Sequence, residues 1–185
     1  MDEMSGWVMA EYRSICLLDD PPADLDVPSA EDVDDYLPPP DAPDGFDLVT
    51  AAPGIVTVNT GVMRGRVHLT VHVLDSEPRE LAAGDWDTIE EITFRALSAY
   101  THAAAGDYYP FAARTPGMFE RSVTPAGAGF YRVRAHEVHR VKAFGEHLDD
   151  DDPPTAERFL IQLWPTTVED DNLRRIKGRT PPLML

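Results

Sequence analysis

The sequence predicts a mainly β protein, built as an antiparallel β-sandwich or a barrel-like fold. Residues 66–73 are the clearest sign, because odd positions are apolar and even positions are polar, as in a strand with one packed and one wet face. The other apolar segments are short, and Gly, Pro and Asp separate them in place of long helical patterns. We therefore expect several strands joined by loops.

Aromatic and β-branched residues mark the other expected strands. These cover residues 7–18, 55–59, 89–97, 130–141 and 158–164. A short helix is the alternative for the first of them. Residues 81–86 and 103–119 are expected to be loops. A short C-terminal helix is predicted over residues 168–177, because acids at its start and bases at its end suit the helix dipole.

Composition divides the chain into four parts. Residues 1–18 hold the first strand of the β domain, 19–47 an acidic, proline-rich arm or insertion, 48–166 the β-sandwich domain, and 167–185 a charged tail. The arm contains eleven carboxylates, no lysine or arginine, and proline clusters at 21–22 and 38–40. This composition favours an extended, solvated segment, in which residues 29–37 have the pattern of one or two helical turns.

Net charge limits the partners that the chain is expected to bind. The 33 acidic residues against 16 basic ones give a formal charge of −17, which opposes association with nucleic acid and favours a basic protein partner. The start of the chain lacks the pattern of a secretion signal, and no window approaches the roughly 18 apolar residues of a membrane helix. A cytoplasmic location is expected, with no direct binding to nucleic acid or membrane.

Candidate metal ligands and the single thiol have ordinary explanations. Cys16 lies in an apolar stretch and is expected to be a small buried side chain, with a reactive thiol as the alternative. His68 and His72 share the polar face of one strand, and His136 and His139 belong to a candidate neighbouring strand. Residues four apart in a strand are separated by roughly 13 Å, too far for one zinc ion, so solvated histidines are expected.

Two charged groups also have competing interpretations. Residues 149–152 resemble a calcium loop only in charge, because they lack the alternating ligands and the glycine of an EF-hand, so a solvated hairpin loop is expected. The polar strand faces carry Arg66, Arg132, Arg134 and Arg140, either as a basic patch or, as we favour, facing the acidic arm in cross-strand and loop ion pairs. No known catalytic motif is present, so the sequence predicts no catalytic residue, cofactor or metal.

Three blocks of sequence resemble one protein family. They are residues 84–95 (GDWDTIEEITFR), 129–136 (GFYRVRAH) and 158–165 (RFLIQLWP). In order and spacing they look like the competence protein J family, small acidic β proteins of bacteria that inhibit a DNA-entry nuclease. The resemblance covers about residues 56–165 and implies that Trp86, Tyr131 and Trp164 are structural. The acidic arm and the charged tail depart from the family pattern.

The resemblance leads to a functional hypothesis: a non-enzymatic, immunity-type binding protein that inhibits a basic nuclease or toxin. An anionic protein can occupy a cationic DNA cleft by mimicking phosphate charge. The expected partner-binding residues are Asp32, Asp34, Asp35, Asp41, Asp44, Asp149, Asp150, Asp151 and Asp152. The alternative is a structural or assembly module of a phage or secretion particle, whose arm contacts neighbouring subunits. A hydrolase or metal enzyme is the third hypothesis.

Overall fold

In the computed structural model, ten β-strands belong to one sheet. The structure describes residues 2–19, 47–105, 121–170 and 172–178, and this part of the chain contains no helix. The strand order is β10-β6-β8-β9-β5-β1-β2-β4-β3, and β7 pairs with β2 beside that path. The prediction of a mainly β fold is therefore confirmed. Within the same residues, no helix is long and apolar enough to cross a membrane.

Six neighbouring strands form the larger part of the sheet. In spatial order they are β10 (Arg174–Lys177), β6 (Thr88–Ala96), β8 (Gly129–Val138), β9 (Arg158–Pro165), β5 (Arg64–Val73) and β1 (Asp2–Glu11). All neighbours in this group pair antiparallel except β5 and β9, which run parallel. β5 keeps the predicted alternation, since Val67, Leu69 and Val71 are buried while the residues between them are half-exposed.

A tight turn at Tyr12 and Arg13 leads from this group of strands to the next. Both residues have positive φ, 49° and 60°, as the two central residues of a type I′ turn do. β1 pairs with β2 (Ser14–Asp19) only at Glu11 and Ser14, and the two strands then diverge. β2 continues between β4 (Ile55–Asn59) and β7 (Thr101–Ala105), and β4 also pairs with β3 (Val49–Ala52).

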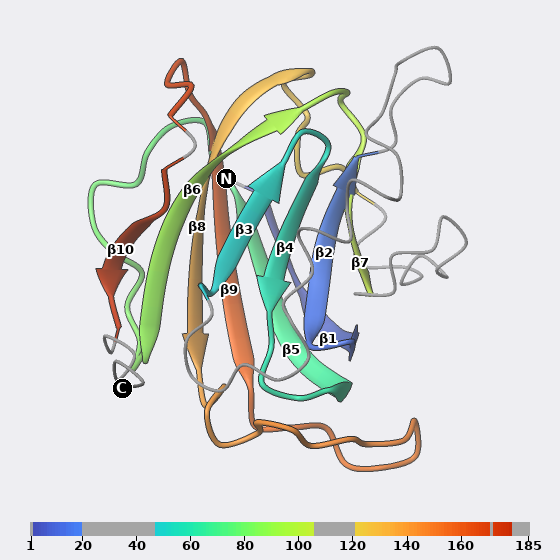
Figure 1. Cartoon of the computed structure of the whole chain (residues 1–185). Coiled ribbons are helices and arrows are strands. Elements are labelled where there is room, and N and C mark those ends of the chain that lie inside the picture. Colours follow the sequence, from blue (N-terminus) through green and yellow to red (C-terminus); the bar gives the residue numbers. More distant parts are fainter. Residues whose placement is uncertain (1, 20–46, 106–120, 171, 179–185) are drawn as a thin grey trace.

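The sheet curls over itself without closing. In Figure 1, β3, β4 and β2 lie in front of β8, β9 and β5. The strands β3 and β6 are near each other but are not paired as described strands. Instead, the buried carboxylate of Glu90 accepts a hydrogen bond from the Leu48 amide at 2.5 Å, and Gly54 N donates to Arg95 O at 2.9 Å. These contacts join the two edges where a ladder of hydrogen bonds is missing.

One apolar cluster fills the inside of the curled sheet. Its members include Val8, Leu17, Leu48, Val58, Leu69, Phe94, Val133, Phe159, Ile161 and Leu163. Burying side chains of this size stabilises the fold by about 1.5–3 kcal/mol each. Cys16 is buried as predicted, and burial raises the pKa of its thiol to about 11, so the thiol stays protonated at neutral pH.

Several details of the sequence prediction are wrong. Residues 7–18 form two strands and a turn, not one strand, and the sheet is mixed, not purely antiparallel. Residues 103–105 belong to β7, not to a loop. The helix expected over residues 168–177 is absent, because β10 pairs with β6 and places Arg174 and Arg175 opposite Glu91 and Glu90. Those ion pairs favour a strand over an isolated helix too short to be stable alone.

Candidate interaction surface

The acidic residues 149–152 form an exposed turn between β8 and β9. The turn is closed by its own residues: the Asp152 amide donates to Asp149 O at 3.0 Å, and the Asp149 amide donates to the Asp152 carboxylate at 2.8 Å. The side chains of Asp149 and Asp150 are 83% and 72% exposed. Arg64 contacts both, at 3.5 Å and 2.8 Å. Four acids therefore share few cations, and the predicted solvated loop keeps an excess of negative charge.

The remaining predicted partner-binding acids cannot be placed beside this turn. Asp32, Asp34, Asp35, Asp41 and Asp44 lie outside the described residues. Their role in binding, like that of the acidic turn itself, stays a prediction.

Three loops meet at one end of the fold, at the bottom of Figure 1. They are the turn between β1 and β2, residues 60–63 between β4 and β5, and residues 139–157 between β8 and β9. Main-chain hydrogen bonds join them. Met63 N donates to Glu146 O at 2.7 Å, and Gly145 N donates to Gly61 O at 2.9 Å. Because these bonds cross between loops, the loops present a single surface.

This surface, which we call the acidic end, combines carboxylates with exposed apolar side chains. Its apolar members are Tyr12, Val141 and Phe144, which are 64%, 59% and 38% exposed. Its carboxylates, all exposed or half-exposed, are Glu11, Glu146, Asp149, Asp150, Asp151 and Asp152, and the same loops and the adjoining end of β5 also carry the cations Arg64, Arg66, Arg140 and Lys142. Exposed apolar and aromatic groups with a charged rim are typical of surfaces that bind other proteins.

Behind the acidic end, Glu157 fixes the loop between β4 and β5. Its Oε1 atom accepts hydrogen bonds from the amides of Gly61 and Val62, at 2.7 Å and 3.1 Å. Burial raises the pKa of Glu157 to about 8, although the two amides partly offset this rise. A Cβ atom on Gly61 would lie 1.9 Å from the main-chain oxygen of Arg140, so only glycine lets the two loops approach this closely.

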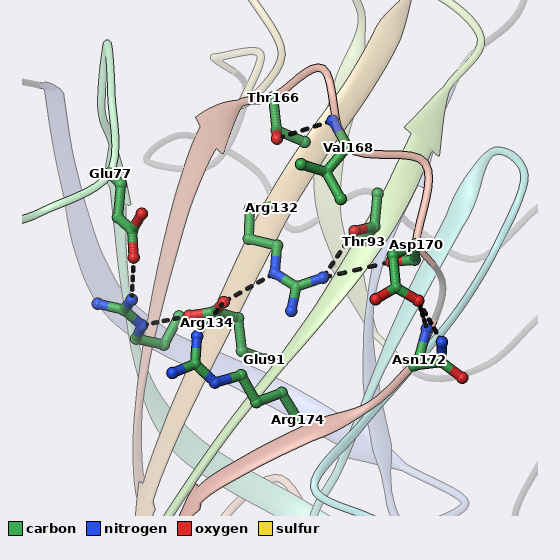
Figure 2. A network of polar contacts seen from close by, with 10 residues as sticks. All are labelled: Glu77, Glu91, Thr93, Arg132, Arg134, Thr166, Val168, Asp170, Asn172 and Arg174. Atoms are coloured by element: carbon green, nitrogen blue, oxygen red, sulfur yellow. Dashed lines mark hydrogen bonds and ion pairs between the residues drawn. The ribbon is translucent and has the colours of Figure 1, made fainter.

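A second group of charges lies on the outer face of β6 and β8, and its centre is buried. Glu91, whose side chain is 3% exposed, accepts a hydrogen bond from Nε of Arg132 and another from Nε of Arg134, each at 2.7 Å (Figure 2). At the rim, Glu77 contacts Arg134 at 3.2 Å, and Arg174 lies 4.0 Å from Glu91. Burial alone would raise the pKa of Glu91, but the arginine hydrogen bonds outweigh it and lower this pKa. We call these five residues the Glu91 network.

The strand arginines make contacts within the chain, and some of these are the cross-strand ion pairs that were expected. Arg132 and Arg134 pair with Glu91 on the neighbouring strand. Arg66 donates to the main-chain oxygen of Asp152 at 2.6 Å. The expected pairing with the arm falls on residues outside those described and stays a prediction.

The candidate metal ligands do not converge. His68 packs edge-on against Trp7, with ring centroids 5.1 Å apart, and His72 Nε2 lies 3.1 Å from a Glu3 carboxylate oxygen. His136 is fully buried, and burial lowers its pKa to about 4, so the expectation of a solvated side chain is wrong there. The described residues contain no group of three or more side chains that could hold a metal ion.

The three aromatic residues expected to be structural occupy suitable places. Tyr131 and Trp164 are buried, and the Tyr131 hydroxyl donates to Gly127 O at 2.9 Å. Trp86 packs against His136, with ring centroids 5.4 Å apart. Tyr131 belongs to the apolar cluster inside the sheet, whereas Trp164 packs against Arg134 and Trp86 against His136 on the outer face.

Sequence reasoning missed the buried acids Glu90, Glu91 and Glu157, and it missed the exposed Tyr12. Glu90 and Glu91 are adjacent in a strand, so their side chains point to opposite faces and one must point inward. That alternation was the available signal for Glu90. No local signal marks Glu157, because its partners come from a loop 96 residues away.

Fold and surface together define an open, strongly curved β-sheet protein with one acidic, partly apolar end. No protein-family model matches the chain, and no curated protein matches it. Two solved structures are similar. "Crocagin biosynthetic gene J" has a TM-score of 0.44 and 17% identity, and the match covers 89% of this chain and 97% of that one. ComJ of Bacillus subtilis, described as an inhibitor of the DNA degrading activity of NucA, has a TM-score of 0.45 and 8% identity, with 88% and 95% covered. Both are distant relationships in fold.

Proposed function

We propose that this chain is a non-enzymatic binding protein whose acidic end covers a basic surface of a partner protein. The observation that carries the proposal is the acidic end itself, where exposed carboxylates surround Tyr12, Val141 and Phe144 on loops joined by main-chain hydrogen bonds. A net charge of −17 accelerates the encounter with a cationic partner. The apolar side chains add the desolvated contacts that contribute most to affinity in protein interfaces.

The partner in this proposal is a nuclease or toxin with a cationic cleft, which the bound chain inhibits. The three sequence blocks that resemble the competence protein J family suggest this class of partner, and a carboxylate-rich surface has the charge needed to replace DNA phosphates in such a cleft. Acids of the arm extend the same contact, and a cytoplasmic location completes the proposal.

The test combines partner capture with an inhibition assay. The full chain is immobilised, incubated with host lysate at low salt and eluted by a salt gradient, and mass spectrometry identifies the bound protein. We expect one basic nuclease or toxin, which elutes as the salt concentration rises because screening weakens the ionic contacts. Its DNA-cleaving or toxic activity is then measured with and without the chain.

Charge-matched variants locate the contact. We expect Asp149→Asn with Asp150→Asn to weaken the captured partner's binding about tenfold. Asp75→Asn with Glu80→Gln removes the same charge from exposed positions in the loop between β5 and β6 and is expected to bind as the parent does. Equal loss in both double variants would show that only net charge matters. Recovery of the chain itself or of particle proteins would replace inhibition with the assembly hypothesis.

A further inference from the structure

Arg13 is a buried cation of the acidic end for which the described residues supply no anionic partner. The residue is 9% exposed, and its Nε and Nη1 atoms are buried with no hydrogen-bond partner in the part of the chain that the structure describes. Its guanidinium contacts the ring of Phe144, whose centroid lies 4.3 Å from the Arg13 Cζ atom. By contrast, the equally buried Arg134 contacts two carboxylates. A desolvated cation ordinarily has such partners, so Arg13 points to a ligand that supplies one.

The backbone fixes the position of Arg13. Its φ of 60° belongs to the turn between β1 and β2. The Arg13 amide donates to Met63 O at 3.1 Å, and the Arg13 carbonyl accepts a hydrogen bond from the Thr60 amide at 2.7 Å. Two bonds to the neighbouring loop therefore hold the residue in one place, so that its guanidinium is preorganised for a ligand.

A second unpaired group lies at the end of β4, directly before the loop to which Arg13 is hydrogen-bonded. The Oδ1 atom of Asn59, the residue before Thr60, is buried and has no hydrogen-bond partner among the described residues. This oxygen can only accept a hydrogen bond, whereas Arg13 can only donate. A ligand that satisfies both carries an anionic oxygen and an N–H group, and a peptide carboxylate with its adjoining amide has both.

We propose that Arg13 is a binding site for a carboxylate carried by the partner protein. Phe144 packs against the apolar part of the partner residue that carries this carboxylate. A carboxylate matches the planar guanidinium and can bind it through two parallel hydrogen bonds, from Nη2 together with either Nε or Nη1. A phosphate dianion is less suited, because Asp149 and Asp150 of the same end repel a double charge more strongly. The assignment rests on the proposed function, since it adds a positively charged contact residue to the acidic end.

The direct test is an NMR titration of the ¹⁵N-labelled full chain at constant ionic strength. The Nε–H signal of Arg13 is assigned by its absence in Arg13→Met. Sodium acetate, N-acetylphenylalanine, sodium phosphate and sodium chloride are the probes. We expect saturable shifts with both carboxylates, with N-acetylphenylalanine bound about threefold more tightly through its contact with Phe144. No saturable shift, or saturation by phosphate and not by acetate, would overturn the proposal. If a carboxylate of the chain itself already fills the site, no saturable shift is expected.

Arg13→Met separates binding from stability, because methionine keeps a contact with the Phe144 ring and removes the charge. We expect the acetate response to vanish and the thermal midpoint to stay unchanged or to rise, because no ion pair is lost. A lowered midpoint would assign Arg13 to stability and overturn the proposal. Arg121→Met is the matched control, since Arg121 is exposed and pairs with Asp2. It should keep the acetate response.

Failure of this site and failure of the proposed function give different results. Asp149→Asn with Asp150→Asn should weaken the captured partner and leave the acetate response intact. Arg13→Met should weaken the same partner by at least about fivefold through one lost charged contact. If the captured partner is no nuclease or toxin, the acetate titration still decides the site. If Arg13→Met binds the captured partner as the parent does, the proposed anchor is wrong while the acidic end remains.

Discussion

The Glu91 network and the acidic end contain the same kinds of side chain and differ in what surrounds them. Glu91 is 3% exposed and accepts hydrogen bonds from two arginines, whereas the Asp149 and Asp150 side chains are 83% and 72% exposed and share Arg64. Breaking a buried ion pair costs several kcal/mol, while an exposed pair contributes about 0–1 kcal/mol. In a chain with 33 acids, charge alone does not locate a binding surface. Carboxylates that are exposed and only partly neutralised by cations are a better guide to a candidate binding surface.

The arginines repeat this contrast. Arg134 and Arg13 are both buried, at 4% and 9% exposure. Arg134 is surrounded by carboxylates and lies over the ring of Trp164, with its Cζ atom 4.9 Å from the centroid. Arg13 lies over a ring as well, but its Nε and Nη1 atoms have no hydrogen-bond partner among the residues that the structure describes. The first arrangement stabilises the sheet, and the second is the basis of the proposed carboxylate site.

The largest effect is expected at the centre of the Glu91 network. Glu91→Ala removes the carboxylate that Arg132 and the buried Arg134 share, and the exposed Glu77 compensates Arg134 only weakly, so the free energy of unfolding should fall by about 3–5 kcal/mol. Urea denaturation at pH 7 measures this, with Glu169→Ala, at an exposed acid, as the control. A loss below about 1 kcal/mol would mean that the Glu91 network stabilises the fold no more than an exposed ion pair does. The contrast between the two regions would then be wrong.

The same residue should add an acid dependence to stability. The pKa of Glu91 is lower in the folded chain than its ordinary value of 4.5. The stabilisation is therefore fully present above that ordinary value and is lost as the pH falls through the folded-state pKa. The gap in stability between the parent and Glu91→Gln should narrow on acidification below pH 4.5.

A smaller effect of opposite sign is expected at Glu157, which is buried like Glu91 but accepts hydrogen bonds from the amides of Gly61 and Val62. Its pKa is raised from 4.5 to about 8, so the folded chain keeps a proton that the unfolded chain releases, and stability falls as pH rises through this window. Glu157→Gln is neutral throughout. It should exceed the parent in stability by on the order of 3 kcal/mol at pH 8 and by less than about 1 kcal/mol at pH 5.

Urea denaturation of both chains at pH 5, 6.5 and 8 measures the difference. If the stabilities of the parent and Glu157→Gln change with pH in parallel, the Glu157 carboxylate is ionised in the folded chain. Glu157 would then be a stabilised buried anion, as Glu91 is. Glu169→Gln, which changes an exposed acid, should follow the parent at all three pH values.

Some strands could be predicted from the sequence because their pattern is local. β5 alternates strictly, and β4 and β9 are rich in β-branched or aromatic residues, so their positions agree with the prediction to within two residues. β3, β7 and β10 have four or five residues each and depend on partners far along the chain. β10 is the plainest case, since the Nε atom of Arg175 reaches the buried Glu90 at 2.7 Å from a segment that alone has the charge pattern of a helix.

The candidate surface was predictable only in part, for the same physical reason. The acidic turn at residues 149–152 can be recognised from composition, and it is exposed as expected. The apolar side chains beside it come from two other places in the chain, at Tyr12 and at Val141 and Phe144. Their meeting depends on the left-handed turn at residues 12–13 and on the close approach of Gly61 to Arg140, and neither can be inferred from a local pattern.

The smallest effect on stability is expected where the effect on binding is largest. Asp149→Asn with Asp150→Asn should shift the thermal midpoint by less than about 2 °C, because both side chains are solvated and the turn keeps its main-chain hydrogen bond. Calorimetry of the full chain measures the shift, next to Asp75→Asn with Glu80→Gln. If the midpoint falls as far as it does in Glu91→Ala, these acids hold the fold together. Weak binding of the captured partner by the double variant would then result from a damaged loop and not from the loss of contacts between these acids and the partner.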